Sequence, residues 1–205
     1  LEQYESEHPH QLIDEYGRLI IDVEKYPSAI NGEGLKPLAD YVHSKGLKLG
    51  IHIMRGIPVQ AYEQDTPIKG TQYTARDIAN PDSHCEWYRG FYGIDMSKPG
   101  AQEYYDSIFE LYASWGVDYI KCDDIANIEI FPHNPYAARR EIEMIRKAID
   151  KCGRDMVLSL SPGPAPVEEH EHLAKNANLW RMTGDFWDEW EKLHAMFERC
   201  YVWQE

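Results

Sequence analysis

The sequence VDYIKCDD at residues 117–124 decides the fold prediction. It begins with apolar residues that suit a parallel strand covered on both faces, and it ends in charge. Because side chains alternate along a strand, Lys121 and Asp123 share one face, while Asp124 lies on the other face with Cys122. Burying an unpaired charge is costly, so the charged end marks either a functional site or a structural Lys–Asp pair that caps the strand.

Helices and strands alternate along most of the chain. Apolar spacing predicts helices over residues 34–45, 99–115, 135–151, 167–177 and 186–200. Strands are predicted at residues 47–53, 117–124, 156–161 and 179–185. Residues 54–99 are expected to form a long, mostly irregular but ordered segment that covers the functional site. This alternation predicts an α/β fold with a parallel sheet and right-handed crossovers. A doubly wound sheet competes with a barrel, but no glycine-rich phosphate loop follows any predicted strand.

The composition is that of one globular domain spanning residues 1–205. Of the 205 residues, 43% are hydrophobic, which is enough for one core. The formal net charge of -14 argues against nucleic acid and against an anionic membrane as partners, so a neutral substrate is expected. Aromatic residues make up 12% of the chain, which is compatible with stacking on carbohydrate.

The four cysteines are scattered, and none forms a CxxC pair. This pattern favours a reducing compartment, and a cytoplasmic location is expected. The chain starts at Leu1 rather than Met, so a leader that has been removed is compatible with the sequence. Residues 168–172 are rich in Glu and His but lack metal-site spacing, so a solvated helix face is expected, with no metal and no cofactor.

Three predicted strand ends in succession carry polar groups. They are Lys121 with Asp123, then Ser161, then Arg181 with Asp185. In a barrel, chemistry lies at the carboxyl ends of the strands, so these side chains are expected to converge. Two carboxylates on separate strands suit glycoside hydrolysis, in which one attacks the anomeric carbon and the other protonates the leaving oxygen.

These residues carry a resemblance to a known family. The sequence DYIKCDD at residues 118–124 is similar to the nucleophile strand of glycoside hydrolase family 27, the α-galactosidase and α-N-acetylgalactosaminidase family. The sequence WRMTGD at residues 180–185 resembles its acid/base segment, and residues 35–51 resemble the helix and strand that precede them. The resemblance implies a (β/α)8 barrel, of which about four β/α units are visible, and a retaining α-glycosidase acting on α-galactosides or α-N-acetylgalactosaminides.

The resemblance also assigns roles to individual residues. Asp123 is implied as the nucleophile and Asp185 as the acid/base. Lys121 and Arg181 are implied to hydrogen-bond sugar hydroxyls. His52 stands where the family often has a Tyr that lines the pocket. Ser161 stands at the family's position that recognises the substituent on carbon 2 of the sugar.

The chain departs from the family pattern in three respects. Ala126 and Asn127 stand where many members have a cysteine, so the disulfide of that loop is not expected. Residues 160–162 replace the usual Cys-Glu-Trp, and the small Ser161 favours an N-acetylgalactosaminide. The first two and the last strands of the family's barrel would lie outside residues 1–205. A half barrel leaves two open sheet edges, so the chain is expected to be a fragment.

Two other functions compete with the glycosidase. In the first, Lys121 forms a Schiff base in a barrel lyase or aldolase, although the nearby Asp123 would keep that amine protonated. In the second, the chain is a carbohydrate-binding barrel fragment without catalysis.

Overall fold

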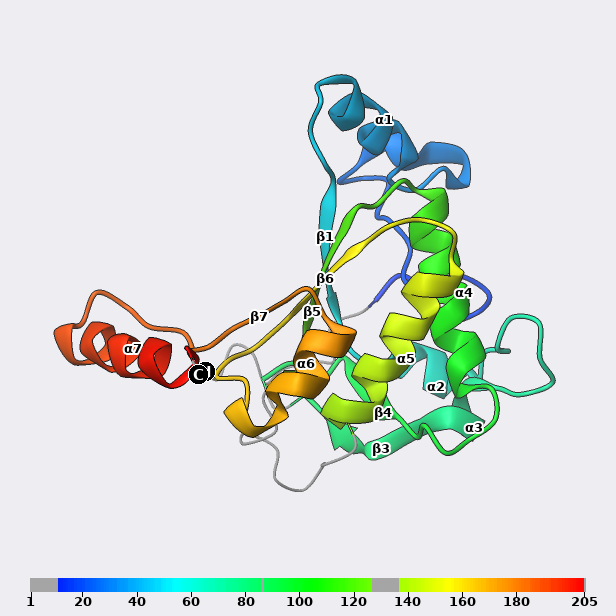
Figure 1. The fold of residues 1–205 in the computed structure, drawn as a ribbon. Helices are drawn as coiled ribbons and strands as arrows, with labels where there is room; N and C mark the ends of the chain where they lie inside the picture. The colour runs from blue at the N-terminus through cyan, green and yellow to red at the C-terminus, as the bar shows by residue number, and fades with distance from the viewer. Residues whose placement is uncertain (1–10, 86, 127–136, 205) are drawn as a thin grey trace.

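The computed structural model describes residues 11–85, 87–126 and 137–204 (Figure 1). A four-stranded parallel sheet has the order β1-β5-β6-β7. Its strands are β1 (Gly50–Met54), β5 (Tyr119–Asp123), β6 (Val157–Leu160) and β7 (Leu179–Trp180). Lys121 of β5 lies between His52 of β1 and Ser159 of β6. All four strands run in the same direction, so their carboxyl ends form one edge.

A helix precedes each of these strands. They are α1 (Lys36–Ser44), α4 (Ala101–Ser114), α5 (Ala137–Lys151) and α6 (His170–Asn176), with a 3-10 turn η3 (Val167–Glu169) before α6 and another, η2 (Pro27–Gly32), before α1. The last helix is α7 (Trp190–Val202). The four predicted β/α units are therefore confirmed, and the alternation is that of a partial (β/α)8 barrel.

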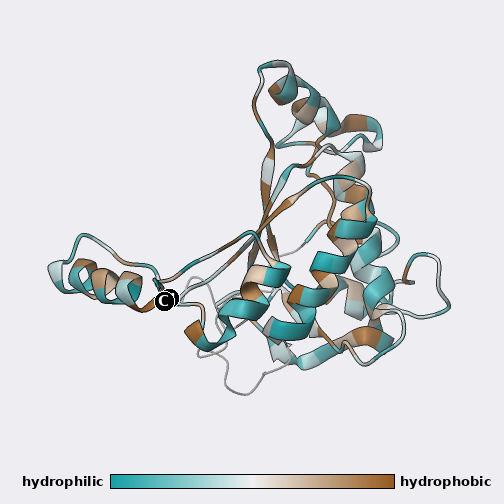
Figure 2. Ribbon diagram, in the orientation of Figure 1, coloured by the Kyte–Doolittle hydropathy of each residue, from teal (hydrophilic) through white to brown (hydrophobic). Residues whose placement is uncertain are grey.

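The core lies between the sheet and the helices α4, α5 and α6, which lie side by side on one face (Figure 1). Ile120 and Cys122 are fully buried on this face of β5, against residues such as Phe109 and Ile145. Figure 2 shows hydrophobic residues along the central strands and mostly hydrophilic ones on the outer side of α5. Tyr119, Lys121 and Asp123 face the other way and are only partly buried.

The expectation that this strand is covered on both faces is therefore wrong for the described residues. Its alternation of buried and half-buried positions follows the period of two, and the helices cover only one of the two faces. The second face, which would point into a closed barrel, carries Lys121 and Asp123.

Residues 54–99 contain more regular structure than predicted. They form β2 (Ile57–Pro58), α2 (Val59–Gln64), α3 (Ala75–Ile78), β3 (Ala79–His84) and β4 (Phe91–Ile94). The strands make an antiparallel sheet in the order β2-β4-β3. These strands contain Pro58, Asn80, Pro81 and Gly93, which are all poor strand formers. Pairing with β4, whose Phe91 and Ile94 are buried, overrides that local preference.

The fourth strand is shorter than predicted, because β7 ends at Trp180 and residues 181–185 form a loop. Its neighbour β6 ends at Leu160, just before Pro162 and Pro164, which have no N–H to continue the ladder. The predicted last helix begins at Trp190 rather than at residue 186.

Helix α7 stands apart from the other described helices (Figure 1). Trp187 and Trp190 are each 70% exposed, and Phe197 is 66% exposed, so the apolar side chains of this segment are not covered by the described residues. The ring of Trp203 lies 5.8 Å from that of Trp180, which connects the end of α7 to β7. In the part of the chain that the structure describes, no helix combines the length and hydropathy needed to cross a membrane.

Candidate active site

Backbone hydrogen bonds join the carboxyl ends of the four parallel strands. The Arg55 N–H, just after β1, donates to the carbonyl of Asp123 at 3.1 Å. The Ser161 N–H, just after β6, donates to the carbonyl of Cys122 at 2.9 Å, and the Ala165 N–H donates to the carbonyl of Arg181 at 2.8 Å. The loops that carry the predicted site residues therefore belong to one connected edge.

Asp123 ends β5 on the face turned away from the helices. One carboxylate oxygen lies 3.3 Å from Nε2 of His52, and the other accepts a hydrogen bond of 3.0 Å from the Asp124 N–H. The Asp123 side chain is 17% exposed and that of His52 is 53% exposed. The structure therefore brings these two predicted site residues together, and the carboxylate stays open to solvent with both oxygens oriented.

Lys121 lies on the same face as Asp123, two residues earlier, but no ion pair joins the two side chains. The alternative of a structural Lys–Asp pair is therefore not supported, and strand geometry accounts for this. Side chains two apart on a strand stand parallel, whereas His52 on the adjacent β1 reaches across to Asp123. Lys121 forms no ion pair with any described residue, so its ammonium is available to a ligand.

Asp185 and Arg181 lie in the loop after β7 and form an ion pair of 2.5 Å. The Asp185 side chain is 76% exposed and that of Arg181 is 31% exposed. The loop after β6 packs closely against the loop after β7. A Cβ atom added at Gly163 would lie only 1.8 Å from the carbonyl oxygen of Thr183. Only glycine allows this approach, so the two loops hold each other at the strand edge.

Ser161 is buried, with only 1% of its surface exposed. Its carbonyl accepts hydrogen bonds from the N–H groups of Ile125 and Ala126, at 3.0 and 3.2 Å. Its hydroxyl has no hydrogen-bond partner in the described part of the chain. The role of Ser161 in recognising the substituent on carbon 2 stays a prediction.

A buried charged cluster behind Asp123 was missed by the sequence reasoning. It joins Arg55, Asp124 and Glu141, whose side chains are at most 2% exposed. Arg55 pairs with Asp124 at 3.0 Å and with Glu141 at 3.2 Å. One signal was present in the sequence, because Glu141 shares the helical face of Ile145 and Ala148. A charge on an apolar helix face needs a buried partner.

The chain was compared with known proteins. A family model described as Alpha galactosidase A matches residues 93–205. This chain belongs to glycoside hydrolase family 27. A crystal structure of a family 27 β-L-arabinopyranosidase from Geobacillus stearothermophilus is 58% identical, with a TM-score of 0.87 over 94% of this chain and 43% of that one. A putative α-N-acetylgalactosaminidase from Bacillus halodurans is 51% identical, with a TM-score of 0.78 over 95% of this chain and 43% of that one.

Among curated family 27 relatives, Alpha-galactosidase 3 of Arabidopsis thaliana is 32% identical over 89% of this chain and 31% of its own length. The solved family 27 structures named above are barrel enzymes, and this chain spans less than half of each. Its predicted segments at residues 118–124 and 180–185 both fall inside the matched region.

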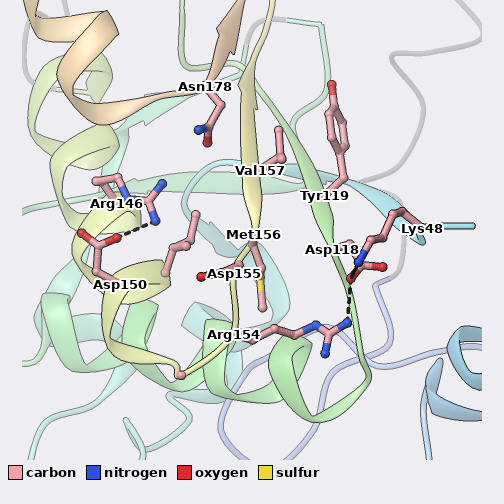
Figure 3. A pocket seen from close by; sticks show the side chains of 12 residues that line it. Lys48, Asp118, Tyr119, Arg146, Asp150, Arg154, Asp155, Met156, Val157 and Asn178 are labelled. Carbon is pink, nitrogen blue, oxygen red and sulfur yellow. Dashed lines mark hydrogen bonds and ion pairs between the residues drawn. The ribbon is translucent and has the colours of Figure 1, made fainter. Parts of the chain in front are cut away.

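A cavity of about 910 Å³ lies elsewhere on this family 27 chain, at the amino ends of β5 and β6 (Figure 3). Four of its charged lining residues are already paired, Arg154 with Asp118 at 2.6 Å and Arg146 with Asp150 at 2.6 Å. Chemistry in barrels occurs at the opposite, carboxyl edge. We therefore assign this cavity no part in catalysis.

Two of the acidic and His-rich residues 168–172 pair with side chains of α5. His172 lies 3.2 Å from Glu143, and Glu169 pairs with Arg139 at 2.5 Å. Within the described residues, no group of three or more His, Cys, Asp or Glu side chains is arranged to hold a metal ion.

The environment of Asp124 raises the pKa of its carboxyl group from 3.8 to about 7. Burial is the largest cause, and the negative charges of Glu141 and Asp123 raise this pKa further. The positive charge of Arg55 and a hydrogen bond with Cys85 lower it. Burial likewise raises the pKa of Glu141, again opposed by Arg55. Near neutral pH the charge behind Asp123 therefore changes with pH.

Asp124→Asn should change how the free energy of unfolding depends on pH. The folded state binds the Asp124 proton more tightly than the unfolded state, so this contribution is largest at acidic pH and is lost as pH rises towards 7. From pH 5 to pH 8 the wild type should lose about 2–3 kcal/mol relative to Asp124→Asn, whose amide resembles the protonated acid. Urea unfolding at several pH values measures the difference.

Asp118→Asn gives a control of opposite sign. Burial alone would raise the pKa of Asp118, but hydrogen bonds from His43, the Leu49 N–H and Arg154 lower it to about 2. Its stabilising contribution is present above pH 4 and is lost as pH falls towards 2. Parallel curves for the wild type and Asp124→Asn from pH 5 to pH 8 would contradict the assignment to Asp124.

Proposed function

We propose that the protein is a retaining glycosidase with Asp123 as nucleophile and Asp185 as acid/base. One observation carries this proposal. Asp123 and Asp185 follow β5 and β7 at the same edge of one parallel sheet, in a chain that belongs to family 27. Two carboxylates at a barrel's carboxyl edge are the groups that double displacement needs.

In the first step an oxygen of Asp123 attacks the anomeric carbon while the bond to the leaving oxygen breaks. Asp185 gives its proton to that oxygen, so a neutral alcohol departs and a glycosyl ester remains on Asp123. In the second step Asp185 takes a proton from water, which attacks the same carbon and releases Asp123. Configuration is retained because two inversions occur.

The remaining residues of this face would bind the sugar. Lys121 has no ion pair among the described residues, so it can donate to ring hydroxyls. His52 orients one oxygen of Asp123 and is itself half-exposed, which allows it to line the sugar pocket. Arg181, now paired with Asp185, would turn to a hydroxyl of the bound sugar.

We propose a galacto-configured pyranose as the glycone. The relatives are named for α-galactosides, α-N-acetylgalactosaminides and β-L-arabinopyranosides. α-D-Galactopyranosides and β-L-arabinopyranosides have the same ring configuration and differ only by the hydroxymethyl group on carbon 5. The high identity to the arabinopyranosidase supports placing β-L-arabinopyranosides among the first substrates to test.

A panel of p-nitrophenyl glycosides on the full-length protein tests this proposal. We expect kcat/KM to be highest on one of the three glycones named above and undetectable on α-glucosides. Hydrolysis of gluco-configured substrates alone would refute it. Binding of galactose without turnover of any substrate would favour the non-catalytic module, and borohydride trapping of a carbonyl substrate on Lys121 would favour the lyase.

Ser161→Ala tests whether this residue reads carbon 2. If it does, the ratio of kcat/KM between the α-N-acetylgalactosaminide and the α-galactoside should shift by roughly 5- to 150-fold, the range for one lost contact of 1–3 kcal/mol. Ser159→Ala is the control, because it removes a hydroxyl two residues earlier, within β6. Equal ratios in the two variants would show that Ser161 does not read carbon 2.

A further inference from the structure

Arg55 holds the backbone on both sides of the peptide that follows Asp123. Its own N–H donates to the Asp123 carbonyl at 3.1 Å. Its Nε donates to the Asp124 carbonyl at 2.6 Å and lies 3.0 Å from the Asp124 carboxylate. Of these two residues the guanidinium therefore contacts Asp124 alone, and its planar group makes both of these contacts in one fixed geometry.

The other end of Arg55 is anchored in the core. Its Nη1 donates to Ser83 Oγ at 3.1 Å and to Glu141 at 3.2 Å. Glu141 in turn accepts hydrogen bonds from the Tyr105 hydroxyl at 2.8 Å and from the Ile94 N–H at 3.3 Å. Arg55 is therefore fixed against β3, β4, α4 and α5 together.

This anchoring acts on an unusual backbone conformation. Asp124 has φ 59°, in the left-handed region that residues other than glycine rarely adopt. In this conformation its N–H points back to the Asp123 carboxylate at 3.0 Å. Such a conformation persists only when surrounding contacts fix it.

We propose that Arg55 is a positioning residue for the nucleophile, because it holds the Asp123–Asp124 backbone in the conformation that orients the Asp123 carboxylate. This inference rests on the proposed glycosidase function. Arg55 is buried behind the sheet and acts through Asp123 and Asp124 without touching the sugar. Its loss should slow formation of the glycosyl ester more than it weakens substrate binding.

The same strand offers a matched control at its other end. Arg154 donates through Nε to the Val117 carbonyl at 2.8 Å and through Nη2 to the Gly116 carbonyl at 3.1 Å. It also pairs with Asp118 at 2.6 Å. Arg154 therefore fixes the start of β5 in the way that Arg55 fixes its end, but away from the carboxyl edge.

The experiment compares Arg55→Met with Arg154→Met in the full-length protein. We expect Arg55→Met to lower kcat about 100-fold with KM within threefold of wild type, which is the pattern of lost transition-state stabilisation. Labelling by a fluorinated galactosyl inhibitor should slow by a similar factor. Arg154→Met should lower Tm but leave kcat within threefold.

Two further variants apply if Arg55→Met does not fold. Arg55→Lys keeps the charge and the backbone bond to Asp123 but loses the Nε–H bond to the Asp124 carbonyl, and Glu141→Gln keeps the shape but removes the charged partner of Arg55. Both should lower kcat at least fivefold. If the wild type is active and these variants match Arg154→Met in kcat, the positioning role is overturned. A wild type inactive on all three galacto-configured substrates overturns the proposed function instead.

Discussion

Asp123→Asn should lower kcat on every substrate by more than about 10³-fold, because an amide cannot form the glycosyl ester. The substitution is nearly isosteric and the side chain is partly exposed, so the fold should not change. The Asp124 N–H and His52 can still hydrogen-bond to the amide. Steady-state kinetics with p-nitrophenyl glycosides, together with circular dichroism, measure both effects.

The control for this variant is Asp150→Asn. Asp150 is 65% exposed and, among the described residues, pairs with Arg146 alone, at the edge of the cavity in Figure 3. It should keep wild-type kcat. Activity of Asp123→Asn within tenfold of wild type would remove Asp123 from the role of nucleophile.

Asp185→Ala should have a large effect that depends on the leaving group. Natural glycosides need a proton on the departing oxygen, so their kcat/KM should fall by about 10²- to 10⁴-fold, the usual contribution of general acid catalysis. The acidic leaving groups of aryl glycosides depart without this proton, so the rate of the glycosylation step should be nearly unchanged. The second step should slow, and azide should restore turnover by attacking the glycosyl ester without a base.

Asp188→Ala is the matched control, since Asp188 is exposed and only three residues further along. It should behave as wild type on both substrate classes. Equal losses for Asp185→Ala on activated and natural glycosides, with no azide rescue, would indicate that Asp185 only holds Arg181 in the loop after β7.

The parallel part of the fold was predictable because each of its elements carries a local signal. Helix α4 ends before Gly116, and α5 before Gly153. Period-two alternation also placed Lys121 and Asp123 on one face correctly. The antiparallel sheet of residues 57–94 was not predictable in this way, because its strands are short and contain Pro58 and Gly93, and only pairing with β4 makes them strands.

The site was only partly predictable, for a related reason. Neighbouring strand ends bring His52 to Asp123, which follows from topology. The cluster of Arg55, Asp124 and Glu141 joins residues far apart in the chain. The helical spacing of Glu141 indicates a buried partner, but it does not identify Arg55 as that partner. The burial of Ser161 likewise depends on tertiary contacts with residues 125 and 126, which local sequence does not specify.

The central claim is that Asp123 forms a covalent bond to the sugar. It is tested most directly by treating the full-length protein with a fluorinated galactosyl inhibitor that traps the glycosyl ester, then locating the added mass by peptide mapping. We expect one sugar per protein, on the peptide that contains Asp123, and none in Asp123→Asn. Attachment at Asp185 or at Lys121, or release of a product with inverted configuration and no trapped ester, would contradict it.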